Sequence, residues 1–249
     1  MRYIIDMAIF GTLPDYTRVV LVARELDNTQ NAVVSRNMLS KAEQTASTLF
    51  EEQAPTEHPP IASWQRAYEA FGILSMGAEE RRSRGTGEQG SRGARDRPIP
   101  AQLYLRTDST PLTDTLNAFA LQNLLPVGGD DLDMISGNVW LRPARGTELF
   151  IPIGRPERPE TPDIGEIVYV DDAPNVLQRC WHGHQGDTTR ITPQTRNALV
   201  YLDCLLPIDR AMAEELAGKL TRLVSGFFGA QVETYYLTRQ QPAVKIEDV

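Results

Sequence analysis

The feature that most restricts the fold is the clustering of short β-branched runs in the C-terminal half of the chain. Gly, Pro and Asp turns separate these runs, and stretches with helical apolar spacing flank them. The expected strands are 18–23, 139–141, 149–151, 167–170, 176–180, 198–202 and 231–237. The expected helices are 35–52, 59–71, 110–125 and 209–228. Because strands and helices do not alternate regularly, the pattern favours an α+β fold over a doubly wound sheet.

The domain organisation predicted from the 249 residues is a single domain over 1–238. Apolar residues make up 41% of the chain, which is enough for a substantial core. Residues 76–100 are dense in Arg, Gly, Glu and Ser and lack aliphatic periodicity, so they predict a mobile surface insertion. Residues 239–249 predict a polar C-terminal tail that frays.

Composition narrows the classes of protein further. No apolar run approaches the ~18 residues that span a bilayer, and the N-terminus is a poor signal peptide. Two cysteines, Cys180 and Cys204, are too few for a disulfide framework, so we expect reduced thiols in a cytoplasmic protein. The net charge of −8 argues against tight, non-specific RNA binding, although the arginines of 76–100 could touch phosphate or a partner subunit in a homodimer.

The segment Gly128-Gly-Asp-Asp-Leu-Asp133 is predicted to be a polar turn. It lacks the Lys and Ser/Thr of a phosphate-binding loop and the ligand spacing of a calcium loop. The simplest interpretation is a turn whose aspartates accept hydrogen bonds from backbone N–H groups.

The segment Arg179-Cys-Trp-His-Gly-His-Gln185 holds two of the three histidines, His182 and His184. A zinc site would need at least a third protein ligand, and the spacing of the residues around the two histidines does not indicate one. We therefore expect neither a metal nor another cofactor. Polar, hydrogen-bonded imidazoles and a general acid/base role both stay open, because histidine titrates near neutrality. Cys180 is a better nucleophile candidate than Cys204, but the surrounding residues match no cysteine hydrolase motif.

Several motifs occur in an order that resembles a known family. They are Trp64-x-x-Ala-Tyr-x-Ala-Phe-Gly72, Pro111-Leu-x-Asp-x-x-Asn117-Ala, Leu-Pro-Val-Gly-Gly-x-Asp-Leu-Asp133, Arg142-x-Ala-Arg-Gly-x-Glu148, Gly165-Glu-x-Val-Tyr-x-Asp-Asp172, Trp181, and Gln185-Gly-Asp-x-Thr-x-Ile-Thr192-x-x-Thr195. Together they resemble free-standing relatives of the B three/four domain, the tRNA-binding and editing module of the phenylalanyl-tRNA synthetase β subunit.

The resemblance implies a three-layer α+β domain in which a strand-rich sheet sandwich is flanked by helices. In the synthetase this module hydrolyses tyrosine wrongly attached to the phenylalanine tRNA, with water as the nucleophile. By resemblance we assign Glu148 as a catalytic candidate, and the histidine-containing loop adds His182 and His184. The candidate substrate-binding residues are Asn117, Asp133, Asp171, Trp181, Gln185 and Thr189.

Two departures from the family pattern bear on the substrate. Gly128 stands where the synthetase has a histidine, and Gly183 stands where free-standing relatives have a tryptophan. Three hypotheses therefore remain: a trans-acting protein that binds or edits aminoacyl-tRNA, an enzyme of small-molecule metabolism that acts on an amino-acid-like amine or carbonyl by general acid/base catalysis, and a non-catalytic binding module.

Overall fold

A computed structural model describes residues 1–73, 103 and 109–247. The predicted insertion at 76–100 lies outside these residues. The helices are α1 (Met7–Thr12), α2 (Ala32–Glu52), α3 (Pro59–Ala70), α5 (Pro111–Asn123) and α6 (Arg210–Phe228). Short 3-10 turns, η1 (Pro55–Glu57) and η3 (Leu132–Met134), accompany them. The strands are β1 (Arg2–Ile5), β2 (Thr17–Arg24), β3 (Val127–Asp131), β4 (Val139–Pro143), β5 (Ile167–Asp171), β6 (Val176–Arg179), β7 (His184–Gln185), β8 (Ala198–Cys204), β9 (Gln231–Leu237) and β10 (Ala243–Lys245).

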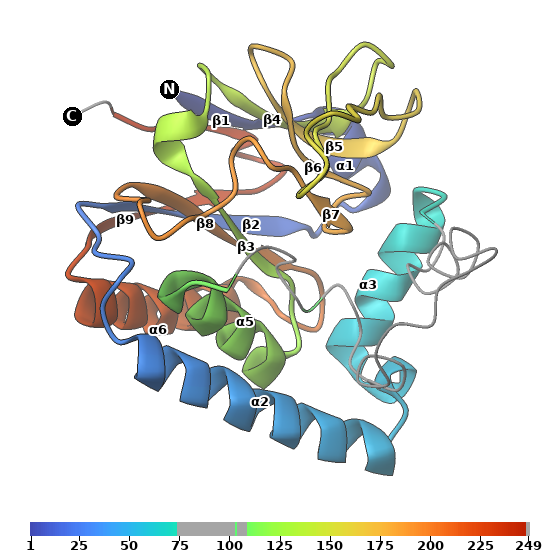
Figure 1. The fold of residues 1–249 in the computed structure, drawn as a ribbon. Helices are drawn as coiled ribbons and strands as arrows, with labels where there is room; N and C mark the ends of the chain where they lie inside the picture. The colour runs from blue at the N-terminus through green and yellow to red at the C-terminus, as the bar shows by residue number, and fades with distance from the viewer. Residues whose placement is uncertain (74–102, 104–108, 248–249) are drawn as a thin grey trace, which may run out of the picture.

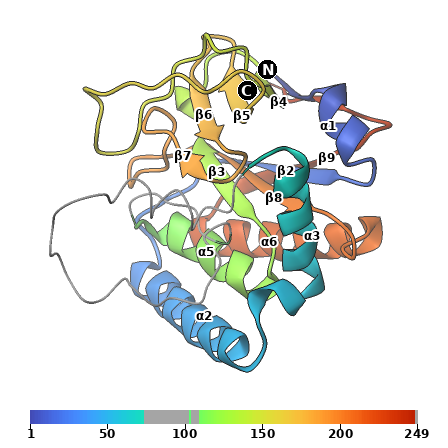
Figure 2. The same cartoon turned by 90° about the vertical axis from the view of Figure 1, so that its right-hand side faces the viewer.

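The elements form three layers, as the resemblance implies. A six-stranded sheet, in the order β10-β1-β4-β5-β6-β7, lies over a four-stranded sheet, in the order β3-β8-β2-β9. Helices α5 and α6 cover the other face of the four-stranded sheet, and α2 packs beneath α5 (Figure 1). Helix α3 stands beside this stack, as the turned view in Figure 2 also shows. The prediction of an α+β fold is confirmed.

Side chains that alternate along β2 belong to two apolar cores, one on each face of the four-stranded sheet. On β2, Val19, Leu21 and Ala23 face the helices, whereas Val20 and Val22 face the six-stranded sheet. Because successive side chains of a strand point to opposite faces, the even-numbered residues of β2 all look into the space between the sheets. That space is the second core, and its polar residues form the site described below.

The helix boundaries follow from capping chemistry. Thr110 and Thr113 form a reciprocal capping box at the start of α5, and Pro111 occupies the first turn. Asp209 accepts from the Met212 N–H at the start of α6, and Gly229 ends that helix with φ of 68°. Both helices lie within two residues of the predicted ranges, 110–125 and 209–228.

Three sequence predictions are wrong. The segment 128–131 is not a turn, because it pairs antiparallel with β8 as part of β3, and only Leu132 begins a turn. The tail does not fray at 243–246, because β10 pairs with β1 and buries Val244 and Ile246. Residues 149–151 do not form a strand of a sheet, because only Leu149 and Phe150 pair there, each in an isolated bridge.

In the part of the chain that the structure describes, no helix combines the length and apolar character needed to cross a membrane.

Candidate functional site

A buried ion pair lies between the two sheets. Arg18 on β2 and Asp203 on β8 are cross-strand neighbours, and both side chains are completely buried. Arg18 Nη1 donates to Asp203 Oδ1 and Oδ2 at 2.8 and 2.7 Å. Its Nε and Nη2 have no hydrogen-bond partner among the described residues, but the guanidinium lies 3.9 Å from the Tyr201 ring centroid and 4.3 Å from that of Tyr169. Cation–π contacts therefore take the place of some hydrogen bonds.

His182 extends this network toward α3. Its Nε2 lies 2.6 Å from Asp203 Oδ2, and its Nδ1 lies 3.0 Å from the Tyr68 hydroxyl. A neutral imidazole that donates from Nε2 and accepts at Nδ1 satisfies both contacts. Burial lowers the pKa of His182, although Asp203 opposes this shift. Burial raises the pKa of Asp203, but Arg18 and His182 outweigh that effect and hold it below its ordinary value.

A second cluster adjoins the ion pair around Asp130. Oδ1 of Asp130 accepts from Gln185 Nε2 and Thr189 Oγ1, both at 2.7 Å, and Oδ2 accepts from the Tyr201 hydroxyl at 3.0 Å. Burial raises the pKa of Asp130, and these three donors oppose the increase. Two predicted substrate-binding residues, Gln185 and Thr189, therefore donate to the same carboxylate, that of Asp130. The sequence prediction placed Asp130 in a turn.

Gly128 makes room for this network. A Cβ at this position would lie 2.2 Å from Cε2 of Tyr201, the cross-strand neighbour of Gly128. The glycine that departs from the family pattern is therefore required by the close approach of the Tyr201 ring.

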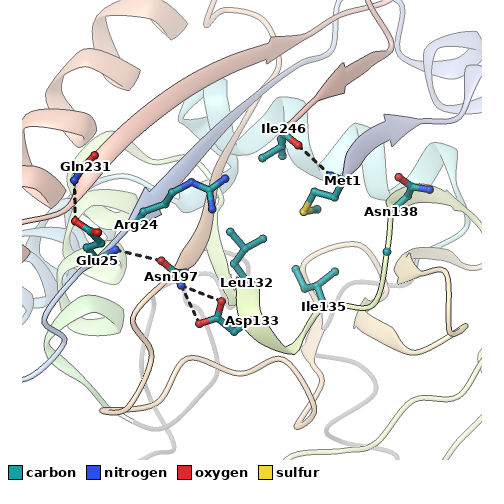
Figure 3. Close-up of a pocket in the computed structure, with 11 residues that line it drawn as sticks. Met1, Arg24, Glu25, Leu132, Asp133, Ile135, Asn138, Asn197, Gln231 and Ile246 are labelled. Atoms are coloured by element: carbon teal, nitrogen blue, oxygen red, sulfur yellow. Dashed lines mark hydrogen bonds between the residues drawn. The ribbon is translucent and has the colours of Figure 1, made fainter. Parts of the chain in front are cut away.

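An open cavity of about 650 Å³ lies at the other end of the sheets. This volume is within the range of small-molecule sites. Two lining residues, Arg24 and Gln231, lie at the ends of β2 and β9, and the others lie in η3 or in segments beside the strands: Met1, Glu25, Leu132, Asp133, Ile135, Gly137, Asn138, Asn197 and Ile246. Figure 3 shows how these side chains surround the space.

Polar side chains form a continuous hydrogen-bonded row along one wall of the cavity (Figure 3). Gln231 Nε2 donates to Glu25 Oε2 at 2.7 Å, and the Glu25 N–H donates to Asn197 Oδ1 at 3.2 Å. Asn197 Nδ2 donates to both oxygens of Asp133, at 2.9 and 3.0 Å. Arg24 adds one positive charge. Its Nη2 donates to the Glu247 carbonyl at 2.5 Å, while its Nε has no partner among the described residues.

The structure separates the three predicted catalytic residues. Glu148 lies on the outer face of the six-stranded sheet, where it accepts from Arg142 Nη1 at 2.5 Å and from the Arg145 N–H at 2.9 Å. Burial raises the pKa of Glu148, but these hydrogen bonds outweigh it and lower the pKa to about 2. His182 lies between the sheets, and His184 is half-buried on β7. None of the three lines the cavity.

Among the six predicted substrate-binding residues, Asp133 alone lines the cavity. Asp171 accepts from the N–H groups of Ser136, Ala173 and Asn175, and so it holds the turn after β5. Trp181 is fully buried among aromatic rings, with φ of 59°. Asn117 is buried on α5.

Sequence reasoning missed Arg18, Arg24, Asn197 and Asp203. One signal was present for two of them: Arg18 and Asp203 are charged residues at the ends of β-branched or apolar runs that read as buried strands. Charged side chains are almost never fully buried unless they are paired. The cavity residues carried no comparable signal, because they come from segments distant in the sequence.

Within residues 1–73, 103 and 109–247, no three His, Cys, Asp or Glu side chains cluster as a metal site would require.

Comparison with known proteins relates the residues of the cavity and of the buried network to a protein family. Residues 103–225 match the model of the B3/4 (B three/four) domain. The chain is a relative of the B3/4 domain. The matched segment supplies six of the cavity residues, which are Leu132, Asp133, Ile135, Gly137, Asn138 and Asn197. It also supplies Asp130, His182, Gln185 and Asp203 of the buried network.

Among solved structures, an N-terminal fragment of the phenylalanyl-tRNA synthetase β subunit from Pyrococcus horikoshii is similar to this B3/4 relative, with 14% identity and a TM-score of 0.45. The match covers 92% of this chain and 49% of that one, so the chain spans about half the length of the fragment. No curated protein matches the sequence.

Proposed function

We propose that the protein binds the aminoacyl end of a mischarged tRNA in the cavity at the end of the sheets and hydrolyses its ester bond. The observation that carries this proposal is that the B3/4 segment, 103–225, supplies most of the cavity. The B three/four domain is the tRNA-binding and editing module of the synthetase that the sequence resembles.

The charges of the cavity suit an aminoacyl ester. Such an ester carries an ammonium group and no carboxylate, and Asp133 offers a carboxylate whose oxygens still have free acceptor positions beyond the two bonds from Asn197. Arg24 also lines the cavity, where its guanidinium adds a positive charge and N–H donors. A hydrogen-bond donor is what a developing oxyanion at the ester carbonyl requires.

The reaction consumes one water molecule. Water adds to the ester carbonyl carbon, and the bond from that carbon to the ribose oxygen breaks. One proton of the water goes to the ribose oxygen and the other to the solvent. The amino acid leaves as its carboxylate. In this scheme Asp133 holds the ammonium group, and Arg24 stabilises the negative charge on the carbonyl oxygen.

The test is a deacylation assay with a panel of mischarged tRNAs at low salt, because phosphate contacts weaken steeply as salt rises. Asp133→Asn removes the negative charge that holds the ammonium group. Hydrogen bonds to charged groups contribute about 1.5–3 kcal/mol, so the rate should fall about 10- to 100-fold. Asp15→Asn, at an exposed position that does not line the cavity, is the matched control and should leave the rate unchanged. If the native protein neither binds nor deacylates any tRNA, the proposal is overturned.

A second candidate function is suggested by Arg24. A free amino acid has a carboxylate that the guanidinium of Arg24 would bind, while Asp133 takes the ammonium group, because both residues line the same cavity. The protein would then act on a small amino-acid-like molecule. Tighter binding of a free amino acid than of its amide would favour this function over tRNA editing.

A further inference from the structure

The floor of the cavity is apolar, in contrast to its polar wall. Four apolar side chains line it: Met1, Leu132, Ile135 and Ile246. Figure 3 shows them around the space that faces the row from Gln231 to Asp133. Met1, Leu132 and Ile135 pack against the core between the sheets, and Ile246 belongs to that core. The floor is therefore an opening onto the inter-sheet core.

Polar groups beside this floor are engaged within the protein: the Met1 ammonium donates to the Ile246 carbonyl at 3.0 Å, and Asn138 uses both ends of its side-chain amide. Asn138 Nδ2 donates to Asp172 Oδ2 at 2.8 Å, and Asn138 Oδ1 accepts from the Arg2 N–H at 2.8 Å. The remaining polar residues of the cavity lie along the opposite wall or, in the case of Arg24, between the wall and the floor (Figure 3). A hydroxyl group that reached the floor would exchange most of its contact with water for contact with apolar side chains.

We infer that the cavity selects an amino-acid group whose side chain is aliphatic, of the size of leucine, isoleucine or methionine. The ammonium group lies at Asp133, and the side chain packs on Leu132 and Ile135. This inference deepens the proposed function, because it takes the cavity to hold the amino-acid end of the substrate. A hydrophobic pocket discriminates about 10- to 200-fold per methylene group, and about 100-fold against an added hydroxyl.

The experiment uses amino-acid amides, which keep the ammonium group, lack the carboxylate and need no tRNA. Calorimetric titration compares leucinamide with serinamide and tyrosinamide. We expect leucinamide to bind at least 10-fold more tightly than either of the others. Equal binding of the three amides, or preference for tyrosinamide, would overturn the inference.

A pair of variants tests the floor directly. Ile135→Thr replaces an ethyl group of the floor with a hydroxyl, so the advantage of leucinamide over serinamide should fall at least 10-fold. Met134→Thr is the matched control, because Met134 is the adjacent residue, is 52% exposed and does not line the cavity. It should leave the preference unchanged. A parallel loss in both variants would assign the effect to the local backbone and contradict the inference.

The deacylation assay keeps this test separate from that of the proposed function. Selective binding of leucinamide without deacylation of any tRNA would overturn the editing function and support the aliphatic preference. Deacylation that is fastest for tyrosyl or seryl groups would support the editing function and overturn the aliphatic preference. Neither binding nor deacylation would overturn both.

Discussion

Arg18 and Arg24 lie on the same strand and on the same face of it, yet their surroundings differ completely. Arg18 is sealed between the sheets with Asp203 and the aromatic rings of Tyr169 and Tyr201. Arg24, six residues further along β2, lies at the open end of the sandwich and lines the cavity. A charge in the first position must be fully paired within the protein, whereas a charge in the second remains available to a ligand.

The comparison suggests a division of roles between the two regions. The sealed network ties β2, β8 and the loop with His182 to one another, and its hydrogen bonds are satisfied mostly from within. The cavity holds polar groups with spare capacity, such as the oxygens of Asp133. Changes in the network should therefore act on stability, and changes in the cavity should act on ligands.

The largest expected effect comes from the same substitution made at both arginines. Arg18→Met leaves Asp203 charged, buried and without its main partner, which should cost about 3–5 kcal/mol of unfolding free energy. Arg24→Met removes a half-buried side chain with one hydrogen bond to a carbonyl and should cost about 1 kcal/mol or less. Urea unfolding of both variants measures the difference.

The double variant Arg18→Met/Asp203→Leu sharpens this test. Replacing both members of a buried ion pair with apolar groups is often neutral, so the double variant should be more stable than Arg18→Met alone. Equal destabilisation by Arg18→Met and Arg24→Met would remove the proposed distinction between the two regions.

A smaller effect is expected from one added methyl group in the network. Gly128→Ala places a Cβ against the Tyr201 ring, so the ring must shift and strain its bond to Asp130. Overpacking of this kind costs about 1–3 kcal/mol. Gly226→Ala in α6 is the control, because nothing lies within 4 Å of its added Cβ, and it should be neutral or stabilise by up to about 1 kcal/mol. Thermal unfolding compares the two variants.

The smallest effect is a pH dependence that arises from His182. Its pKa is lowered in the folded protein by burial, so below the unfolded value of about 6.5 the unfolded chain binds a proton that the folded protein does not. Stability should therefore decrease as the pH falls below about 6.5, by at most about 1.4 kcal/mol per pH unit.

His182→Gln is the matched variant for the pH dependence, since glutamine keeps a donor for Asp203 without titrating. Unfolding free energies measured between pH 7.5 and 5.5 should slope less steeply in this variant than in the native protein. An identical slope would show that His182 does not cause the dependence.

Much of the fold was predictable from local patterns. Helices α3, α5 and α6 carry their apolar stripes within their own residues, so the predicted ranges 59–71, 110–125 and 209–228 lie within two residues of the observed bounds. Strand β3 was not predictable in this way. Its glycines and aspartates have low strand propensity, and it forms because pairing with β8 overrides that preference.

For the candidate site residues too, the sequence motifs gave the residues but not their contacts. Gln185 and Thr189 were predicted to bind substrate from the motif order, and the structure shows that both donate to Asp130. Glu148 was assigned from the same kind of motif, but its hydrogen bonds to Arg142 and Arg145 give it a place in the loop after β4, on the opposite side of the six-stranded sheet from His182.

The sequence by itself determined the four longer helices α2, α3, α5 and α6, most of the strands and the α+β class, because helical spacing, alternation and capping are properties of neighbouring residues. It did not indicate the short helix α1. It also carried the motifs of the B3/4 domain. Only the tertiary structure decided that Arg18 pairs with Asp203, that Gly128 lies against Tyr201, and that Asp133, Asn197 and Gln231 border one cavity. Those arrangements depend on strand register and on contacts between residues far apart in the chain, and neither leaves a local pattern in the sequence.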